Sequence, residues 1–441
     1  MKGHLSNVAW GILDYAAYPI GMLAVAPILL RNLGMAQYGI WTVASAAVST
    51  GGIIASGFGD ANIQHIASSR DKGDRALVLG AVRSMMSINL VLGVLLGLAG
   101  WLLSSIVASH VAMQDPSLRQ GCIWSLRIAS FLMLARAIES VCISTQRAYE
   151  RYGAAVRISI LVRMLALAFA AVISLWIHNV VAIMASTAVL MMPGLWLQRI
   201  GLKQHLGVQS LIPKFDPDAL RALLSFGAFS WLQAVSGVFF AQVDRLIIGV
   251  SLGAVVVASY SLCAQMTLPI FGFAASGLHF LFPYLSNRFA TPTNHSLQKP
   301  ILIALGWNVA FVLAASFGLA VFGPRILSAW AGPTVQIAAE PVLMILIWSS
   351  ALLGLNVTGT YALLALGRVR IVTWINLAGG LTMLLLILWL TPKIGIRAIA
   401  FARLSYSFVT LLIYIPLINE LRNRQSTRRM GPLVHAVCED L

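Results

Sequence analysis

The chain has 441 residues, of which 59% are hydrophobic and only 10% are charged, and its net charge is +16. This composition excludes an ordinary soluble domain and indicates a multi-pass membrane protein. The basic residues lie between long apolar runs and form no block interleaved with aromatic residues, so we expect no nucleic-acid partner. The four cysteines include no CxxC pair and the eight histidines lack ligand spacing, so we expect neither disulfides nor a metal site.

Runs of about 18 or more apolar residues are long enough to cross a bilayer as helices. The first run begins at Val8 and has about 20 residues, which is too long for a signal-peptide core. We expect the first six spanning helices near residues 8–30, 39–60, 80–108, 121–146, 153–177 and 179–197. Six more are expected near residues 222–250, 254–285, 300–322, 336–365, 370–391 and 394–418.

The sequence therefore predicts an all-α polytopic membrane protein with about twelve transmembrane helices. Its expected parts are an N-terminal six-helix lobe (1–198), a cytoplasmic inter-lobe linker (199–221), a C-terminal six-helix lobe (222–418) and a cytoplasmic polar tail (419–441). With the N-terminus in the cytoplasm, the segments on that side carry 18 lysines and arginines, and the opposite side carries five. Cytoplasmic loops are enriched in these residues, so we expect both termini in the cytoplasm.

The two halves resemble each other at an offset of about 218 residues. Three segment pairs carry the match: HIASSR (His65–Arg70) with PYLSNR (Pro283–Arg288), LRNLGMAQY (Leu30–Tyr38) with GVSLGAVVVASY (Gly249–Tyr260), and RAYERYGAAVR (Arg147–Arg157) with LLALGRVRIVT (Leu363–Thr373). Because six helices per half is an even number, the predicted repeat is parallel, with a pseudo-twofold axis along the membrane normal. Transporters of this kind bind their substrate between the lobes and alternate access by rocking them.

Seven arginines fall within the predicted helices: Arg83, Arg127, Arg136, Arg157, Arg163, Arg245 and Arg403. A charge near the bilayer centre costs about 2.5–3.5 kcal/mol on insertion scales, so such side chains face a bundle interior or a wet cavity. We expect Arg136 and Arg163, near mid-depth, to contact an anion, because a planar guanidinium group matches phosphate oxygens. Arg127, Arg157 and Arg83 are expected to extend this contact into a path along which the anion moves. The alternative is that these arginines snorkel or pair internally.

Three acidic residues at membrane depth are candidates for coupling transport to H⁺ or Na⁺: Asp14, Asp244 and Glu139. Asp14 precedes Pro19, whose ring frees a backbone carbonyl and is expected to kink the first helix. A carboxylate beside freed carbonyls could hold Na⁺ or a proton, or it could be a satisfied polar group near the cytoplasmic end. Asp244 also suits an ion pair with Arg245, and Glu139 suits a neutralising partner for Arg136. We expect no other cofactor.

Six segments resemble the polysaccharide (O-antigen) flippases of the multidrug/oligosaccharidyl-lipid/polysaccharide exporter superfamily. They are LRNLGMAQYGIW (Leu30–Trp41), GFGDANIQHIASSR (Gly57–Arg70), QVDRLIIGVSLG (Gln242–Gly253), LFPYLSNR (Leu281–Arg288), YALLALGRVRIV (Tyr361–Val372) and GIRAIAFARLSYS (Gly395–Ser407). No single motif is diagnostic, but their order and spacing are specific, and the resemblance spans residues 8–418.

The resemblance implies a carrier of the bacterial inner membrane with two six-helix lobes around a cationic vestibule. It would turn undecaprenyl-diphosphate-linked oligosaccharide units from the cytoplasmic to the periplasmic leaflet, for the synthesis of O-antigen of lipopolysaccharide, of exopolysaccharide or of capsule. Its partners would be the lipid-linked oligosaccharide, membrane lipids and other polysaccharide-assembly proteins. One departure is that five of the seven intramembrane arginines lie in the first half, which argues against a symmetric site.

Three other functions fit parts of the sequence. A multidrug exporter of the same fold would need an acidic cavity for cationic drugs, which the arginines oppose. A lipid II flippase usually has two further helices, which the sequence does not contain. A membrane-embedded glycan polymerase or ligase would need a sizeable polar loop, and the longest loop has only Asp216 and Asp218 as acids. We therefore expect a transporter and no enzymatic activity.

Overall fold

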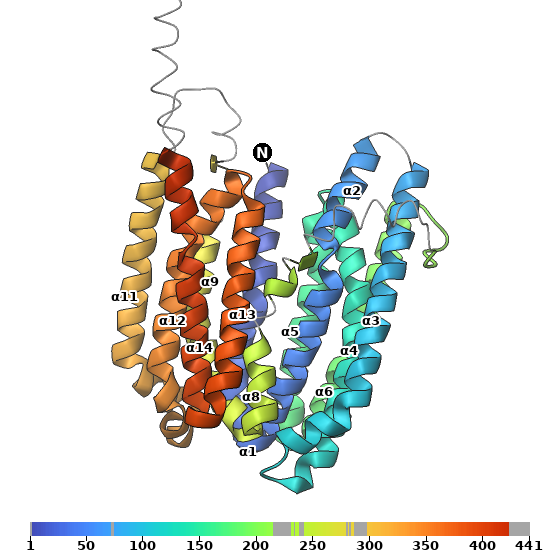
Figure 1. The fold of residues 1–441 in the computed structure, drawn as a ribbon. Coiled ribbons are helices and arrows are strands. Elements are labelled where there is room, and N and C mark those ends of the chain that lie inside the picture. The colour runs from blue at the N-terminus through green and yellow to red at the C-terminus, as the bar shows by residue number, and fades with distance from the viewer. Residues whose placement is uncertain are drawn as a thin grey trace, which may run out of the picture. The chain divides into compact units, whose positions relative to one another are not determined.

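A computed structural model describes residues 2–71, 75–214, 231–232, 234–237, 242–278, 281, 284–285 and 298–422 of the chain. Within these ranges the structure is helical and contains no strand (Figure 1). Nine of the described helical stretches are long and apolar enough to cross a membrane. Their outward side chains include many large exposed hydrophobic residues, such as Leu102 at 66% and Phe317 at 67% exposure. The prediction of an all-α multi-pass membrane protein is confirmed.

The first half of the chain contains six helices: α1 (Lys2–Ser56), α2 (Gly59–Asp71), α3 (Arg75–Val111), α4 (Arg119–Ala148), α5 (Tyr152–Trp176) and α6 (Val180–Leu206). A short 3-10 helix, η1 (Pro116–Leu118), precedes α4. The second half contains α8 (Asp244–Leu252), α9 (Ala254–Leu278), α11 (Gln298–Ala331), α12 (Pro333–Ala365), α13 (Val369–Ile394) and α14 (Ile396–Leu411). Most of the predicted seventh helix, 222–250, and the tail after residue 422 lie outside the described residues, so the count of twelve stays a prediction.

Helix α1 contains the first two predicted spanning helices. Its apolar stretch continues into α2 as Ala17–Ala67, which has 51 residues. At 1.5 Å per residue this is about 77 Å, more than twice the hydrocarbon thickness of about 30 Å. The backbone breaks at Gly34 (φ 75°, ψ 169°), a conformation that glycine adopts without steric penalty. In Figure 1 the chain runs away from the N-terminus and returns toward α2. No such break occurs at Pro19, where α1 continues.

The chain divides into two compact units. The first unit comprises Met1–Met266, Arg325–Glu340 and Ile394–Ile396, and the second comprises Thr267–Pro324, Pro341–Lys393 and Arg397–Leu441. In the first unit α4 is central, because it packs against α1, α2, α3, α5 and α6. In the second unit α12 contacts its neighbours through hydrogen bonds from Asn308 of α11, Tyr361 to α9 and Ser349 to α14.

Three backbone and side-chain features recur at the predicted offset. The shared Leu-Gly pair ends at Gly34 (φ 75°) and Gly253 (φ 87°), each joining two helical segments. The fourth helix of each half ends in the same Schellman arrangement. After α4, the Glu150 N–H donates to Arg147 O (2.8 Å) and the Arg151 N–H to Gln146 O (3.1 Å). After α12, the Gly367 N–H donates to Leu364 O (3.0 Å) and the Arg368 N–H to Leu363 O (2.9 Å).

The third recurring feature is a buried asparagine that ties the third helix of each half to the fourth. In the first unit the Asn89 amide donates to Ala137 O (2.9 Å) and Ser140 Oγ (2.8 Å) of α4. In the second unit the Asn308 amide donates to Gly354 O (2.9 Å) and Thr358 Oγ1 (3.1 Å) of α12. The predicted internal repeat is therefore confirmed by backbone dihedral angles and hydrogen bonds. The aligned pair Arg70 and Arg288 is not comparable, because residue 288 lies outside the described residues.

Substituting either asparagine by alanine is expected to lower the free energy of unfolding by about 1–2 kcal/mol, because a buried carbonyl loses its donor where water cannot replace it. Thermal unfolding of Asn89→Ala and Asn308→Ala in detergent would measure this. The matched control is Thr382→Ala, a half-buried residue whose hydroxyl donates an exposed hydrogen bond within its own helix to Ala378 O (2.8 Å). If the control lowers the melting temperature as much as the asparagine variants do, the asparagine bonds contribute nothing specific.

Candidate anion site in the first unit

Five charged side chains from three long helices form a cluster in the first unit, which we call the charge cluster. Its members are Asp14 of α1, Arg136, Glu139 and Arg147 of α4, and Arg163 of α5. Helix α4 positions three of them because it is the central helix of the unit. Helix α4 is not among the nine described stretches that qualify as apolar spans.

Asp14 bridges two arginines from different helices. Its Oδ2 atom lies 2.8 Å from Arg147 Nη2, and its Oδ1 atom lies 3.3 Å from Arg163 Nη1. The carboxylate thus links α1 to α4 through one oxygen and to α5 through the other. Asp14 is therefore paired, but its side chain keeps 18% of its surface exposed.

Glu139 pairs with Arg136 one turn earlier on the same helix. Its Oε2 atom lies 2.7 Å from Arg136 Nη1, and its Oε1 atom accepts a hydrogen bond of 3.2 Å from the Gln198 amide of α6. The side chain of Glu139 is only 9% exposed. This pairing is the neutralising role that the sequence predicts for Glu139. Both carboxylates therefore use both of their oxygens, and Glu139 is the more deeply buried of the two.

The cluster has an excess of positive charge, with three guanidinium groups against two carboxylates. The arginine side chains remain 26% (Arg136), 30% (Arg147) and 24% (Arg163) exposed, so each keeps surface that a further group can contact. A guanidinium group has five N–H donors in a planar fork. The arrangement can therefore bind an additional anion, and an anion there would balance the remaining charge.

Two of the other predicted path residues are held outside the cluster. The Arg127 guanidinium lies over the rings of Trp101 (4.9 Å) and Trp124 (5.2 Å), both 44% exposed, which is a cation–π arrangement on the outer surface of the unit. The Arg83 guanidinium donates to Ser210 O (3.3 Å), in the segment that follows α6. The third, Arg157, is exposed near the start of α5.

Asp244 is fully buried near the start of α8 and accepts a hydrogen bond of 2.6 Å from the Tyr260 hydroxyl of α9. Its other oxygen accepts the backbone N–H of Arg245 at 2.7 Å. The carboxylate is thus bonded to a phenol and to the backbone. The side-chain ion pair of Asp244 with Arg245 stays a prediction.

Two residues of the site were missed from the sequence. Arg147 lies just beyond the predicted fourth helix (121–146), although eleven residues separate it from Arg136 and place the two within about 20° on a helix. That shared face was the signal that could have included it. Gln198 gave no signal, because its role depends on the packing of α6 against α4. Within the described ranges no group of three or more His, Cys, Asp or Glu residues could hold a metal ion.

At the aligned positions of the second half, the residues of the charge cluster are replaced by uncharged ones. At the offset of about 218 residues, Arg136 and Glu139 correspond to Gly354 and Val357, and Arg163 corresponds to Leu381. The helical scaffold is thus repeated, whereas the charged residues are not. This difference adds to the reason given above for expecting an asymmetric site, which is that five of the seven intramembrane arginines lie in the first half.

The fold is that of the MOP exporter superfamily, as comparison with solved structures shows. An inward-facing multidrug resistance transporter of the MATE family superimposes with a TM-score of 0.68 at 14% identity, covering 94% of this chain and 96% of that chain. The lipid II flippase MurJ in an inward closed conformation gives 0.71 at 12% identity, covering 92% and 87%. A MOP superfamily transporter from Pyrococcus furiosus gives 0.54 at 16% identity, covering 94% and 96%.

The family follows from the sequence itself. Residues 5–289, which are more than half of the chain, match the family described as "Polysaccharide biosynthesis protein". The chain belongs to this family of multi-pass membrane proteins with a transporter fold. No curated protein matches the sequence. The predicted resemblance to the polysaccharide flippases of the MOP superfamily is confirmed at the level of family and fold.

Proposed function

We propose that the protein is a flippase that moves undecaprenyl-diphosphate-linked oligosaccharide units from the cytoplasmic to the periplasmic leaflet of a bacterial inner membrane, with both termini in the cytoplasm. The observation that carries the proposal is the charge cluster, whose three arginines exceed its two acids on long helices. Membership of the polysaccharide biosynthesis family supports a glycan substrate. The product would feed O-antigen, exopolysaccharide or capsule assembly.

The anion contact that we propose is made by Arg136 and Arg163, as predicted from the sequence, with Arg147 added. A diphosphate presents several acceptor oxygens, and guanidinium forks bind such oxygens with charge-assisted hydrogen bonds. In surroundings of lowered dielectric each contact is stronger than in water. The diphosphate is the part of the substrate that cannot cross hydrocarbon unaided. Flipping needs no bond to change, so the residues bind and release without chemistry.

Arg83, Arg127 and Arg157 are proposed as contacts nearer the two ends of the path. Arg127 lies eight residues after the start of α4, and Arg83 lies eight residues after the start of α3. These helix starts belong to opposite ends of the bundle, because α3 and α4 are consecutive antiparallel helices (Figure 1). Their observed partners are aromatic rings and a backbone carbonyl, so neither arginine is neutralised by an acid in these contacts.

Asp14 is the acid that we propose for ion coupling. It occupies donors of Arg147 and Arg163 that the diphosphate would need. Protonation of Asp14, or binding of Na⁺ to it, would weaken both contacts and release the arginines for substrate. Glu139 and Asp244 are less suited, because their side chains are more deeply buried than that of Asp14.

The test is a flipping assay with purified protein in lipid vesicles. A fluorescent undecaprenyl-diphosphate oligosaccharide is followed by its accessibility to a membrane-impermeant quencher, beside a lipid II analogue and a cationic dye. We expect the diphosphate-linked oligosaccharide to be translocated and the dye to be excluded. Transport of the dye alone would assign the protein to the drug exporters, and transport of lipid II alone would assign it a peptidoglycan precursor.

Asp14→Asn is expected to abolish the dependence of flipping on an imposed H⁺ or Na⁺ gradient, because an amide neither exchanges a proton nor attracts Na⁺. The measurement is the initial flipping rate with and without each gradient. Asp115→Asn is the matched control, since Asp115 is exposed and bonds only to Ser117 at the start of η1. An unchanged gradient dependence in Asp14→Asn removes Asp14 from the coupling mechanism. If Asp244→Asn loses the gradient dependence instead, Asp244 is the coupling residue.

A further inference from the structure

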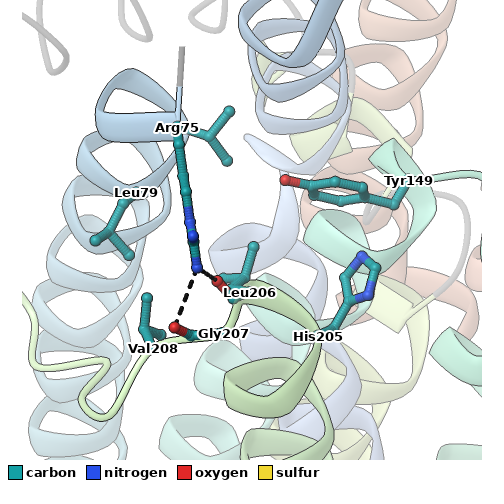
Figure 2. Close-up of a pocket in the computed structure, with 8 residues that line it drawn as sticks. Arg75, Leu79, Tyr149, His205, Leu206, Gly207 and Val208 are labelled. Atoms are coloured by element: carbon teal, nitrogen blue, oxygen red, sulfur yellow. Dashed lines mark hydrogen bonds between the residues drawn. The ribbon is translucent and has the colours of Figure 1, made fainter. Parts of the chain in front are cut away.

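A second basic site lies in the first unit, at the end of the bundle where α3 begins and where α4 and α6 end (Figure 2). It is a cavity of about 350 Å³, which is within the usual size of small-ligand pockets. Its lining residues are Arg75, Val78, Leu79, Tyr149, His205, Leu206, Gly207 and Val208. None of the eight is acidic, and three of them are polar donors.

Arg75 is held in place by the end of α6. Its Nη2 atom donates to Leu206 O (2.6 Å) and to Gly207 O (3.1 Å), and Figure 2 shows the guanidinium beside these carbonyls. Gly207 permits this approach, since it has φ 61° and a Cβ there would lie 2.6 Å from Arg75 Nη2. Both bonds use the two N–H groups of Nη2. The three donors on Nη1 and Nε therefore remain for a ligand, as far as the described residues show.

Tyr149 and His205 form the opposite wall. Their rings pack edge to face with centroids 4.6 Å apart. In Figure 2 the Tyr149 hydroxyl points toward the side of the cavity on which Arg75 lies. Arg151 Nη1 lies 2.6 Å from His205 Nδ1, and an arginine can only donate. His205 is therefore neutral with its proton on Nε2, a buried atom that makes no hydrogen bond within the described residues.

Further positive charge surrounds this wall. The Arg70 guanidinium lies 5.8 Å from the centroid of the Tyr149 ring and donates to Ala148 O (3.2 Å). Arg70, Arg75 and Arg151 thus place three cations around the cavity. Three acids are close in sequence to these arginines: Asp71 follows Arg70, Asp74 precedes Arg75, and Glu150 lies between Tyr149 and Arg151. Glu150 is exposed and has φ 58°. The remaining lining is apolar, from Val78, Leu79, Leu206 and Val208.

We infer that this cavity binds a phosphate group, and that the phosphate belongs to the headgroup of an anionic membrane lipid. Fixed guanidinium and hydroxyl donors recognise phosphate oxygens, and the apolar half of the lining suits the glycerol backbone and upper acyl chain. Basic pockets between spanning helices are a general means of binding anionic headgroups. The same donors would also bind the phosphate group of a soluble compound. The inference does not depend on the proposed flippase function.

The experiment measures binding of short-chain phosphatidylglycerol, short-chain phosphatidylcholine and inorganic phosphate to the purified full-length protein by calorimetry. We expect phosphatidylglycerol to bind about tenfold tighter than phosphatidylcholine, because a zwitterionic headgroup offers no net charge to the arginines. Arg75→Gln is expected to remove this preference. Tyr149→Phe, which keeps the ring packing and the helix end, is expected to weaken binding about threefold to tenfold. Arg119→Gln, an exposed arginine at the other end of α4, is the matched control.

The outcomes separate the sources of the phosphate. If inorganic phosphate competes with phosphatidylglycerol and binds as tightly, the cavity is a phosphate site, but its ligand is a soluble compound and the lipid assignment is wrong. If phosphatidylglycerol binds and inorganic phosphate does not compete, the lipid assignment stands. Equal binding of the two lipids, or an equal loss in Arg119→Gln and Arg75→Gln, overturns the inference. Flipping activity plays no part in these readouts, so they are independent of the proposed function.

Discussion

Replacing Arg163 by glutamate is expected to abolish flipping of the lipid-linked oligosaccharide in vesicles, with a loss of at least about 100-fold. The substitution removes a guanidinium donor and places a second carboxylate beside Asp14, whose Oδ1 lies 3.3 Å from Arg163 Nη1. The cluster then changes from a net positive to a net negative charge. Losing one partner of a desolvated charge pair costs about 2–5 kcal/mol, and repulsion of the diphosphate adds to this.

Two further variants separate a loss of substrate contact from a loss of fold. Exchanging the pair, as Asp14→Lys with Arg163→Glu, restores an ion pair between α1 and α5 but moves the positive charge to another helix. We expect this double variant to regain thermal stability without regaining flipping. Arg119→Glu makes the same charge change at an exposed site and should flip at the wild-type rate. Flipping at the wild-type rate by Arg163→Glu would show that Arg163 makes no essential anion contact.

Gly39→Ala is expected to lower the free energy of unfolding by about 3 kcal/mol or more. A Cβ at Gly39 would lie 1.9 Å from Ala254 O and 2.5 Å from its carbonyl carbon, so the backbone of α9 would have to move away from α1. Overpacking of this kind costs about 1–3 kcal/mol when side chains can adjust. Here the obstacle is backbone, which cannot rotate away. Thermal unfolding and the yield of monodisperse protein in detergent are the measurements.

The matched control for this substitution is Gly201→Ala. Gly201 is an exposed residue of α6, and a Cβ there would meet nothing within 4 Å. Because alanine favours helix more than glycine does, this change should be neutral or slightly stabilising. If Gly39→Ala unfolds at the same temperature as wild type, then α1 and α9 are not packed as closely as the structure shows.

The helical scaffold was largely predictable from the sequence, because apolar runs report directly on the thickness of the bilayer. The Leu-Gly pairs also predicted the repeat, and Gly34 and Gly253 are the positions where the backbone adopts the same positive φ. The ends of helices were less predictable. Helix α6 continues to Leu206, nine residues beyond its apolar run, since its polar final turns are bonded to Arg75 and end at Gly207.

The candidate site was predictable only in part. The Arg136–Glu139 pair follows from a spacing of three residues on one helix, and the structure contains it. The contacts of Asp14 with Arg147 and Arg163 join helices that are distant in the sequence. No periodicity reports which of several arginines will meet a given carboxylate. The contacts of Arg127 were likewise not predictable, because Trp101 belongs to α3 and Trp124 to α4.

The position of Arg127 between Trp101 and Trp124 has a consequence for how the protein responds to its lipid environment. Tryptophans concentrate at the membrane–water interface, and α4 rises about 30 Å from Arg127 to Arg147, which equals the hydrocarbon thickness of an average bilayer. The two arginines then mark the two membrane surfaces, and Arg136 falls close to the midplane. A markedly thinner or thicker bilayer would force α4 to tilt or draw one anchor out of its surface. The depth of the proposed anion contact would thus depend on how well the length of α4 matches the thickness of the bilayer.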